Sequence, residues 1–138
     1  MWVLVVAFVA LCLGAASGSA FDLSLHDTPT MARVCRTAVA IQDASESWGT
    51  HSKEQQLAWI NCHAYMAGFS AGYGDHREVA FDGIPMRTFC IRFPVDASAA
   101  RTAAVFVGWA DRNPSHLWHL KLNVAVMTAL SEAWPCQN

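Results

Sequence analysis

The histidines of this chain are the side chains that could first suggest a metal or catalytic site, and the sequence has six of them. His116 and His119 are three residues apart, so they could share one face of a helix, with Asp111 close by. Zinc is usually held by four ligands, and no fourth ligand follows at a suitable spacing. Asp75 and His76 could act as an acid and a base, but no nucleophile or oxyanion donor stands beside them. The sequence therefore predicts no catalytic site, no metal and no cofactor.

Cysteines offer a different chemistry, because four of them lie beyond the first 20 residues, namely Cys35, Cys62, Cys90 and Cys136. Zinc sites built from cysteine and histidine use close pairs, whereas these cysteines are far apart in the sequence. His63 could activate Cys62 as a thiolate, but a catalytic cysteine needs a thiol that is not bridged. An even number of cysteines in a short exported chain predicts two disulfides.

Export is indicated by the first 20 residues. Residues 2–13 are nearly all apolar and residues 14–20 are small, as at the cleavage site of a secretory signal peptide. The apolar run is too short to span a membrane. A lipid anchor at Cys12 is disfavoured, because Leu11 is larger than the residue expected before a lipidated cysteine. We expect cleavage after Ala20, and hence a periplasmic or secreted protein.

The remaining residues, 21–138, are enough for a single domain. The formal net charge of the chain is −2. Such a balance gives neither the basic surface that nucleic-acid-binding proteins use nor a polybasic patch for a membrane surface. We therefore predict no nucleic-acid partner, and no stable membrane span once residues 1–20 are removed.

The element that must position the rest of the chain is a helix predicted over residues 53–73. Ser52 and Gln55 have the spacing of a capping box at its start. Apolar residues recur at helical spacing, and the face that they form narrows to small residues along the helix. These small residues are Ala64, Gly68 and Gly72. A face without bulky side chains lets a second helix approach closely, so we predict helix packing there. The alternative is that the glycines only weaken a surface helix.

Three further helices are predicted from apolar periodicity, over residues 29–42, 96–112 and 117–133. Thr28 and Asp96 are the expected N-caps of the first two of them. The predicted fold class is therefore all-α, a small four-helix bundle with one long loop between the second and third helices and two disulfides.

The long loop is predicted over residues 75–89. Gly72 and Gly74 are expected to end the helix before it, because glycine commonly follows the last helical residue. Residues 79–81 and 88–92 could pair as a small hairpin within or beside the loop. A connection of this length is uncommon in a compact domain and is often functional.

Helix order restricts how the cysteines can pair. Adjacent antiparallel helices place Cys35 of the first helix beside Cys62 of the second. The start of the third helix lies beside the end of the fourth, so Cys90 can meet Cys136. The pairing of Cys35 with Cys136 and of Cys62 with Cys90 stays open as the alternative.

Four short motifs follow one another along the chain: CHAYMAG at residues 62–68, CIRFP at 90–94, NP at 113–114 and ALSEAWPC at 129–136. Together with Cys35, their order and spacing resemble the Rap1a/Tai family of immunity proteins, which are small exported helical proteins with four cysteines. The resemblance covers about residues 29–136. The sequence departs from the family where Arg92 and Phe93 separate the third cysteine from its proline, and in the length and charge of the long loop.

The resemblance implies a non-catalytic immunity protein. Characterised members bind and block a peptidoglycan-cleaving amidase that the type VI secretion system delivers between bacteria, and they act in the periplasm, often as dimers. We therefore expect an amidase effector as the protein partner, and a homodimer. The alternative is a periplasmic helical chaperone or small-ligand-binding protein with no toxin partner, which an apolar cavity would favour.

We expect the partner to be held by loops, because the helix faces are needed for the core. The candidates are Asp75, His76, Arg77 and Arg87 on the long loop, and Arg112, His116 and Trp118 at the corner between the third and fourth helices. Loop aromatics beside arginine and histidine are typical anchors of interfaces. The alternative for Trp118 is that it packs the corner between the two helices.

Overall fold

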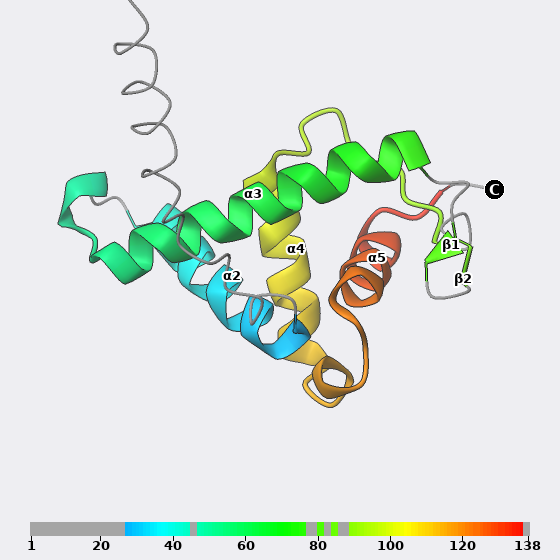
Figure 1. The fold of residues 1–138 in the computed structure, drawn as a ribbon. Helices are drawn as coiled ribbons and strands as arrows, with labels where there is room; N and C mark the ends of the chain where they lie inside the picture. The colour runs from blue at the N-terminus through cyan, green and yellow to red at the C-terminus, as the bar shows by residue number, and fades with distance from the viewer. Residues whose placement is uncertain (1–26, 45–46, 77–79, 82–83, 86–88, 137–138) are drawn as a thin grey trace, which may run out of the picture.

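The structure is a computed structural model that describes residues 27–44, 47–76, 80–81, 84–85 and 89–136. Within these residues the chain forms four α-helices, α2 (Thr28–Asp43), α3 (Lys53–His76), α4 (Ala99–Arg112) and α5 (Leu122–Ala133). The 3₁₀ turns η2 (Trp48–Thr50) and η4 (His116–Trp118) precede α3 and α5, and the strands β1 (Ala80–Phe81) and β2 (Ile84–Pro85) form a short antiparallel pair. The all-α prediction is confirmed (Figure 1). The predicted signal peptide lies outside the described residues.

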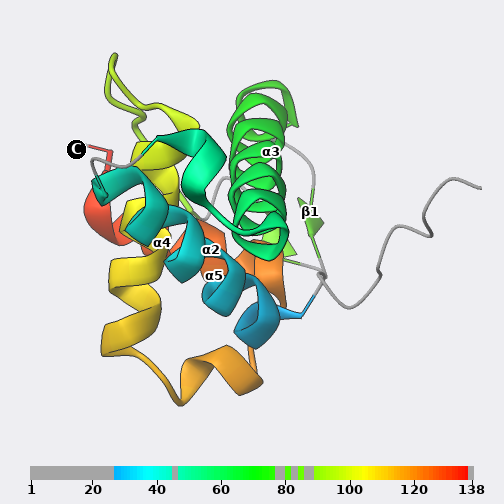
Figure 2. The same cartoon turned by 90° about the vertical axis from the view of Figure 1, so that its left-hand side faces the viewer.

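The longest helix, α3, runs along one side of the molecule (Figure 1). The helices α2, α3 and α4 pack against one another, and α5 packs against α4. Figure 2 shows α2 and α4 on the same side of α3. None of the helices in the described part combines the length and apolarity needed to cross a lipid bilayer.

The start of α3 is the capping box that the sequence predicted. The N–H of Ser52 donates to Oε1 of Gln55 (2.8 Å), and the N–H of Gln55 donates to Oγ of Ser52 (3.2 Å). Each residue therefore satisfies a donor that the first turn of a helix leaves without a partner.

The starts of α2 and α4 differ from the prediction. Asp27, not Thr28, caps α2, because its carboxylate accepts from the N–H of Thr30 (2.7 Å). Ser98, not Asp96, caps α4. The Asp96 carboxylate instead pairs with the guanidinium of Arg101. In both cases a residue one or two positions from the predicted one has a side-chain oxygen that accepts an N–H of the first turn.

The end of α3 is also later than predicted, because the helix continues through Gly72 and Gly74 to His76. Tyr73 explains this continuation. Its side chain is buried, and its hydroxyl donates to the carbonyl of Phe89 and accepts from the N–H of Ile91 (3.1 Å). These tertiary contacts outweigh the cost of placing glycine in a helix, which is about 1 kcal/mol per residue relative to alanine.

Two boundaries in the second half of the chain need correction. The short hairpin joins β1 to β2, whereas Ile91, from the predicted second strand, forms an isolated bridge with Pro135. The last helix begins at Leu122, because Lys121 has an extended backbone (φ −64°, ψ 147°) that separates α5 from η4.

The core lies between the helices and is closed by two disulfides. Phe106 on α4 is fully buried, as is Met66 on α3. Cys35 and Cys62 join α2 to α3 with a Cα–Cα distance of 5.1 Å. Cys90 and Cys136 join the segment before α4 to the tail after α5, with a Cα–Cα distance of 5.5 Å. The preferred disulfide pairing is therefore confirmed.

The close helix packing predicted for the small-residue face of α3 was wrong. Ala64 and Gly68 are exposed, and a Cβ atom added at Gly68 or Gly72 would meet no atom of the described residues within 4 Å. The neighbouring residues Cys62 and Met66 face the core instead. Because α3 is apolar around most of its circumference, its periodicity does not determine which side packs inward.

Candidate functional site

A groove of about 1450 Å³ lies between α3 and the segment formed by η4 and the start of α5. The first turns of α2 close the groove on a third side, where Pro29, Thr30 and Arg33 line it. Its lining is mostly apolar and includes the small-residue face of α3. The groove was not predicted from the sequence.

The α3 wall of the groove is a row of aromatic rings. Tyr65, Phe69 and Tyr73 are four residues apart, so they lie on one side of the helix. The centroids of successive rings are 6.4 Å apart in both steps, with nearly parallel planes. The glycines Gly68 and Gly72 lie next to these rings and have no side chain to fill the space. The wall is therefore apolar, with open positions beside its rings.

The two ends of this aromatic row differ in the hydrogen bonds that their hydroxyls make within the described residues. Tyr73 is held by its two hydrogen bonds to the segment beside Cys90. Burial raises the pKa of Tyr65 to about 12. The Tyr65 hydroxyl is therefore neutral at physiological pH and can still donate a hydrogen bond.

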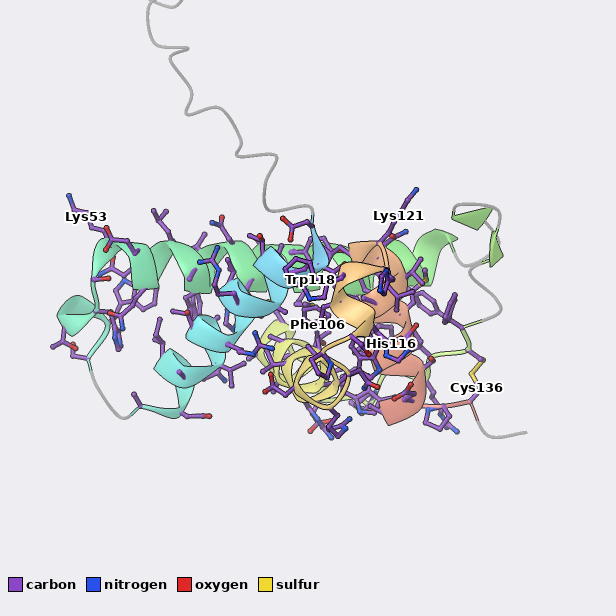
Figure 3. All side chains as sticks on the ribbon, turned by 90° about the horizontal axis from the view of Figure 1, so that it is seen from below. Lys53, Phe106, His116, Trp118, Lys121 and Cys136 are labelled. Carbon is purple, nitrogen blue, oxygen red and sulfur yellow. A yellow bond between two sulfur atoms is a disulfide. The ribbon has the colours of Figure 1, made fainter. Side chains whose placement is uncertain are left out.

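The opposite wall comes from η4 and the start of α5. Leu117 is buried and packs the corner between α4 and α5, whereas the side chain of Trp118 is 77% exposed. The hydroxyl of Thr28 donates to the carbonyl of Leu120, which ties this wall to the start of α2. Figure 3 shows Trp118 on this turn. The alternative in which Trp118 packs the corner was wrong, because Leu117 does so instead.

The charged groups that line the groove are mainly cationic. They are Arg33, Arg36 and Lys121, with Asp27 as the single carboxylate among the lining residues that the structure describes. Asp27 is engaged in capping α2, and Arg36 pairs with Asp111 at 2.6 Å. Arg33 is exposed and forms no ion pair with any residue of the described part. The groove therefore favours a negatively charged group.

The corner after α4 exposes the residues that the sequence nominated there. Arg112 at the end of α4 and His116 and Trp118 of η4 are all exposed, and Trp118 also lines the groove. The ring of His116 lies 6.3 Å from the buried ring of Trp109. The predicted corner and the unpredicted groove thus form one continuous surface. Of the three nominated corner residues, Trp118 is the one that lines the groove.

The predicted loop residues are not placed in the same way. Arg77 and Arg87 lie outside the described residues. Asp75 and His76 belong to the last turn of α3, and their side chains are likewise not described. Their role in binding stays a prediction.

The histidines and acidic residues show no constellation for chemistry in the described part. No three histidine, cysteine, aspartate or glutamate side chains of that part come together as ligands for a metal ion. His63 has a structural environment, because its Nδ1 lies 2.8 Å from the carbonyl oxygen of Trp59 and its ring stacks on that of Trp59 at 4.1 Å. Cys62 beside it is bridged to Cys35.

The groove residues missed by sequence reasoning carried a weak signal. Tyr65, Phe69 and Tyr73 recur at a spacing of four, which indicates one helix face but not whether that face is covered. No pattern in the sequence singles out Arg33. Only the three-dimensional arrangement of α2, α3 and α5 gives these residues a common surface.

Comparison with known proteins identifies the family. The family model for Rap1a immunity proteins matches residues 25–136. No match was found among the curated proteins or among the solved structures. The match covers all four helices, both disulfides and the exposed corner. The chain therefore belongs to the family of Rap1a immunity proteins.

Proposed function

We propose that this protein is a non-catalytic inhibitor that binds a peptidoglycan-cleaving amidase effector of a type VI secretion system and blocks it in the periplasm. Membership of an immunity protein family supports a toxic effector as the partner. The observation that assigns binding to a particular surface is the exposure of Trp118, a large aromatic side chain that is 77% exposed. Tryptophan is among the residues most enriched at the energetic centre of protein interfaces.

The corner that bears Trp118 is well suited to inhibition because hydrogen bonds hold it in one conformation. The N–H of Asn113 donates to the carbonyl of Trp109 (3.1 Å), as does its side-chain amide (2.9 Å). The N–H of Leu120 donates to the carbonyl of His116 (3.0 Å). A loop that is already ordered loses less conformational entropy on binding, so more of its contact energy appears as affinity.

The chemistry of the cysteines supports the periplasm as the compartment in which the protein acts. Disulfides persist in oxidising compartments such as the periplasm, and this domain has two. The apolar start of the chain supports export by a cleaved signal peptide, which would leave residues 21–138 as one domain. Peptidoglycan lies in that compartment, so an inhibitor there meets its target where the target acts.

A homodimer is the second part of the proposal. Leu57 and Ile60 on α3 are 57% and 47% exposed, one helical turn apart. Exposed apolar side chains that share a helix face are typical of surfaces that bind another protein. Light scattering after size exclusion should give the mass of two chains, and Ile60→Glu should give the mass of one. A parent protein that stays monomeric at every concentration would contradict this part.

The inhibitor is tested with a peptidoglycan amidase effector, which is sought first among the genes beside its own. Both proteins are exported to the periplasm of a bacterial host, and survival and binding are measured. We expect the parent to protect the host and Trp118→Ala to weaken binding by at least about 2 kcal/mol with unchanged circular dichroism.

The matched control is Trp48→Ala, which removes a tryptophan that is 44% exposed on η2 and does not line the groove. We expect this variant to bind as tightly as the parent. Equal binding by Trp118→Ala would contradict the corner as the binding surface. Failure of the parent to bind any amidase would contradict the amidase as the target.

A further inference from the structure

The geometry of the groove points to a second ligand, and we propose that it binds a single-chain amphiphile with an anionic head group, of the chemical class of a fatty acid. The proposal does not depend on the effector, because it concerns the purified protein alone. Binding sites for small ligands are typically concave and mostly apolar, with a few polar groups that fix orientation. The groove has this character over a volume of about 1450 Å³.

The α3 wall provides the surface for an acyl chain. From Ala64 to Tyr73 the groove follows nine helical steps, which corresponds to about 14 Å at 1.5 Å per residue. Phe69 and the ring of Tyr65 line this path, and Met127 of α5 faces the groove from the other side. Burying an acyl chain there removes apolar area from water on both the ligand and the protein, which is the main source of affinity for such ligands.

The first turn of α5 provides the surface for the head group. Lys121, Leu122 and Asn123 all line the groove. The first intrahelical hydrogen bond of α5 is donated by Ala125, and no side chain caps the helix. Its N-terminal N–H groups therefore favour an anion. Asn123 also lines the groove, and its Nδ2 atom has no hydrogen-bond partner in the described part.

The charge of the groove agrees with an anionic head. Arg33 lines the α2 side and forms no ion pair within the described residues, whereas Arg36 on the same helix is paired with Asp111. Lys121 lies on the α5 side, and His119 also lines the groove. Asp27 is the one carboxylate among the described lining residues, and it accepts the N–H of Thr30. A ligand with the same acyl chain but a neutral head, such as the corresponding alcohol, would gain none of this attraction.

An acyl chain fits this surface better than an extended peptide does. A peptide backbone needs hydrogen-bond partners along its whole length when it is removed from water. On the α3 wall the hydroxyl of Tyr73 is already engaged by Phe89 and Ile91, which leaves Tyr65 as the other hydroxyl among the lining residues of that wall. An acyl chain requires no such partners.

The experiment is a titration of the purified protein, residues 21–138, with dodecanoate below its critical micelle concentration at neutral pH. Calorimetry gives the dissociation constant, and the part of the tryptophan fluorescence change that Trp118→Phe abolishes reports on the groove. We expect saturable binding of one dodecanoate per chain. Dodecanol, which has the same chain and a neutral head, should bind at least about tenfold more weakly, as should dodecanoate to Arg33→Gln. Lys53→Gln is the charge control, because Lys53 lies at one end of the molecule, well away from Lys121 (Figure 3), and does not line the groove.

A groove-filling variant locates the site. Gly68→Trp places a ring in the groove at a position where a Cβ meets no atom of the described part of the chain within 4 Å, so it should fold as the parent does and lose dodecanoate binding. Ala67→Trp is the matched control, because Ala67 is exposed on α3 but does not line the groove. Unchanged dodecanoate binding by Gly68→Trp would overturn the site, and equal binding of dodecanol would overturn the anionic head. No binding by the parent would overturn the proposal, and the groove would then belong to a protein partner if Gly68→Trp also lost protection against the amidase.

Discussion

The two sides of α3 are both apolar, yet only one of them is packed. The inner side carries Cys62 and Met66, which are fully buried, and a disulfide ties it to α2. The outer side carries Leu57, Ile60 and Gly68, which are exposed. The difference cannot come from hydrophobicity, which the two sides share. It comes from which neighbouring elements the chain supplies.

Between these two sides lies the aromatic row of the groove, which is partly covered. Burying apolar area stabilises the folded state by roughly 25 cal/mol per Å², and the exposed part of this row does not make that contribution. A core tied by disulfides can tolerate such a surface without unfolding. The comparison therefore separates a part of α3 that specifies the fold from a part that is available for binding, and substitutions on the two sides should behave differently.

The largest expected effect is on the inner side. Met66→Ala removes a fully buried side chain from between α3 and its neighbours, and should lower the free energy of unfolding by about 2–5 kcal/mol. The matched change on the outer side, Ile60→Ala, should alter it by no more than about 0.5 kcal/mol in dilute protein. Urea denaturation followed by circular dichroism measures both. Equal losses for the two variants would show that both sides of α3 are packed in solution.

A smaller effect is expected at the boundary between the two sides, where Tyr73 ends the aromatic row. Tyr73→Phe removes the hydroxyl that accepts from the buried N–H of Ile91 and donates to Phe89, so it should cost about 1–3 kcal/mol. Tyr65→Phe is the control, because the Tyr65 hydroxyl forms no hydrogen bond within the described residues, and its loss should cost less than about 0.5 kcal/mol. The same denaturation assay separates them, and a costly Tyr65→Phe would mean that this hydroxyl is also anchored.

Much of the fold could be predicted because it depends on short-range chemistry. The capping box of Ser52 and Gln55 is local, and it starts α3 where the sequence indicated. The disulfide pairing followed from the order of the helices, which brings Cys35 to Cys62. The end of α3 could not be predicted, because the hydrogen bonds of Tyr73 to residues far along the chain override the local effect of the glycines.

The site was predictable only in part, for a related reason. Trp118 could be nominated because a tryptophan in a polar connection is unusual wherever the helices lie. The groove depends on the distance between α3 and α5, which no local pattern encodes. The contribution of Arg33 and Tyr65 to the groove therefore became visible only with the tertiary structure. For the same reason, the small-residue face of α3 was predicted to pack against a helix, whereas it borders the groove.

The smallest expected effect is also the one that tests the outer side most directly. In an exposed helix, glycine costs about 0.5–1 kcal/mol relative to alanine, because glycine loses more backbone entropy on folding. A Cβ at Gly68 has none of the atoms that the structure describes within 4 Å, so Gly68→Ala should raise the free energy of unfolding by about that amount. If a second helix packed closely on this face in the isolated domain, the added methyl would instead crowd it and cost about 1–3 kcal/mol. The sign of the change, measured in dilute protein by urea denaturation, therefore distinguishes an open face from a covered one. Gly108→Ala provides the comparison, because the nearest atom to its Cβ is a guanidinium nitrogen of Arg112 at 3.5 Å, an ordinary contact that should give the same small gain.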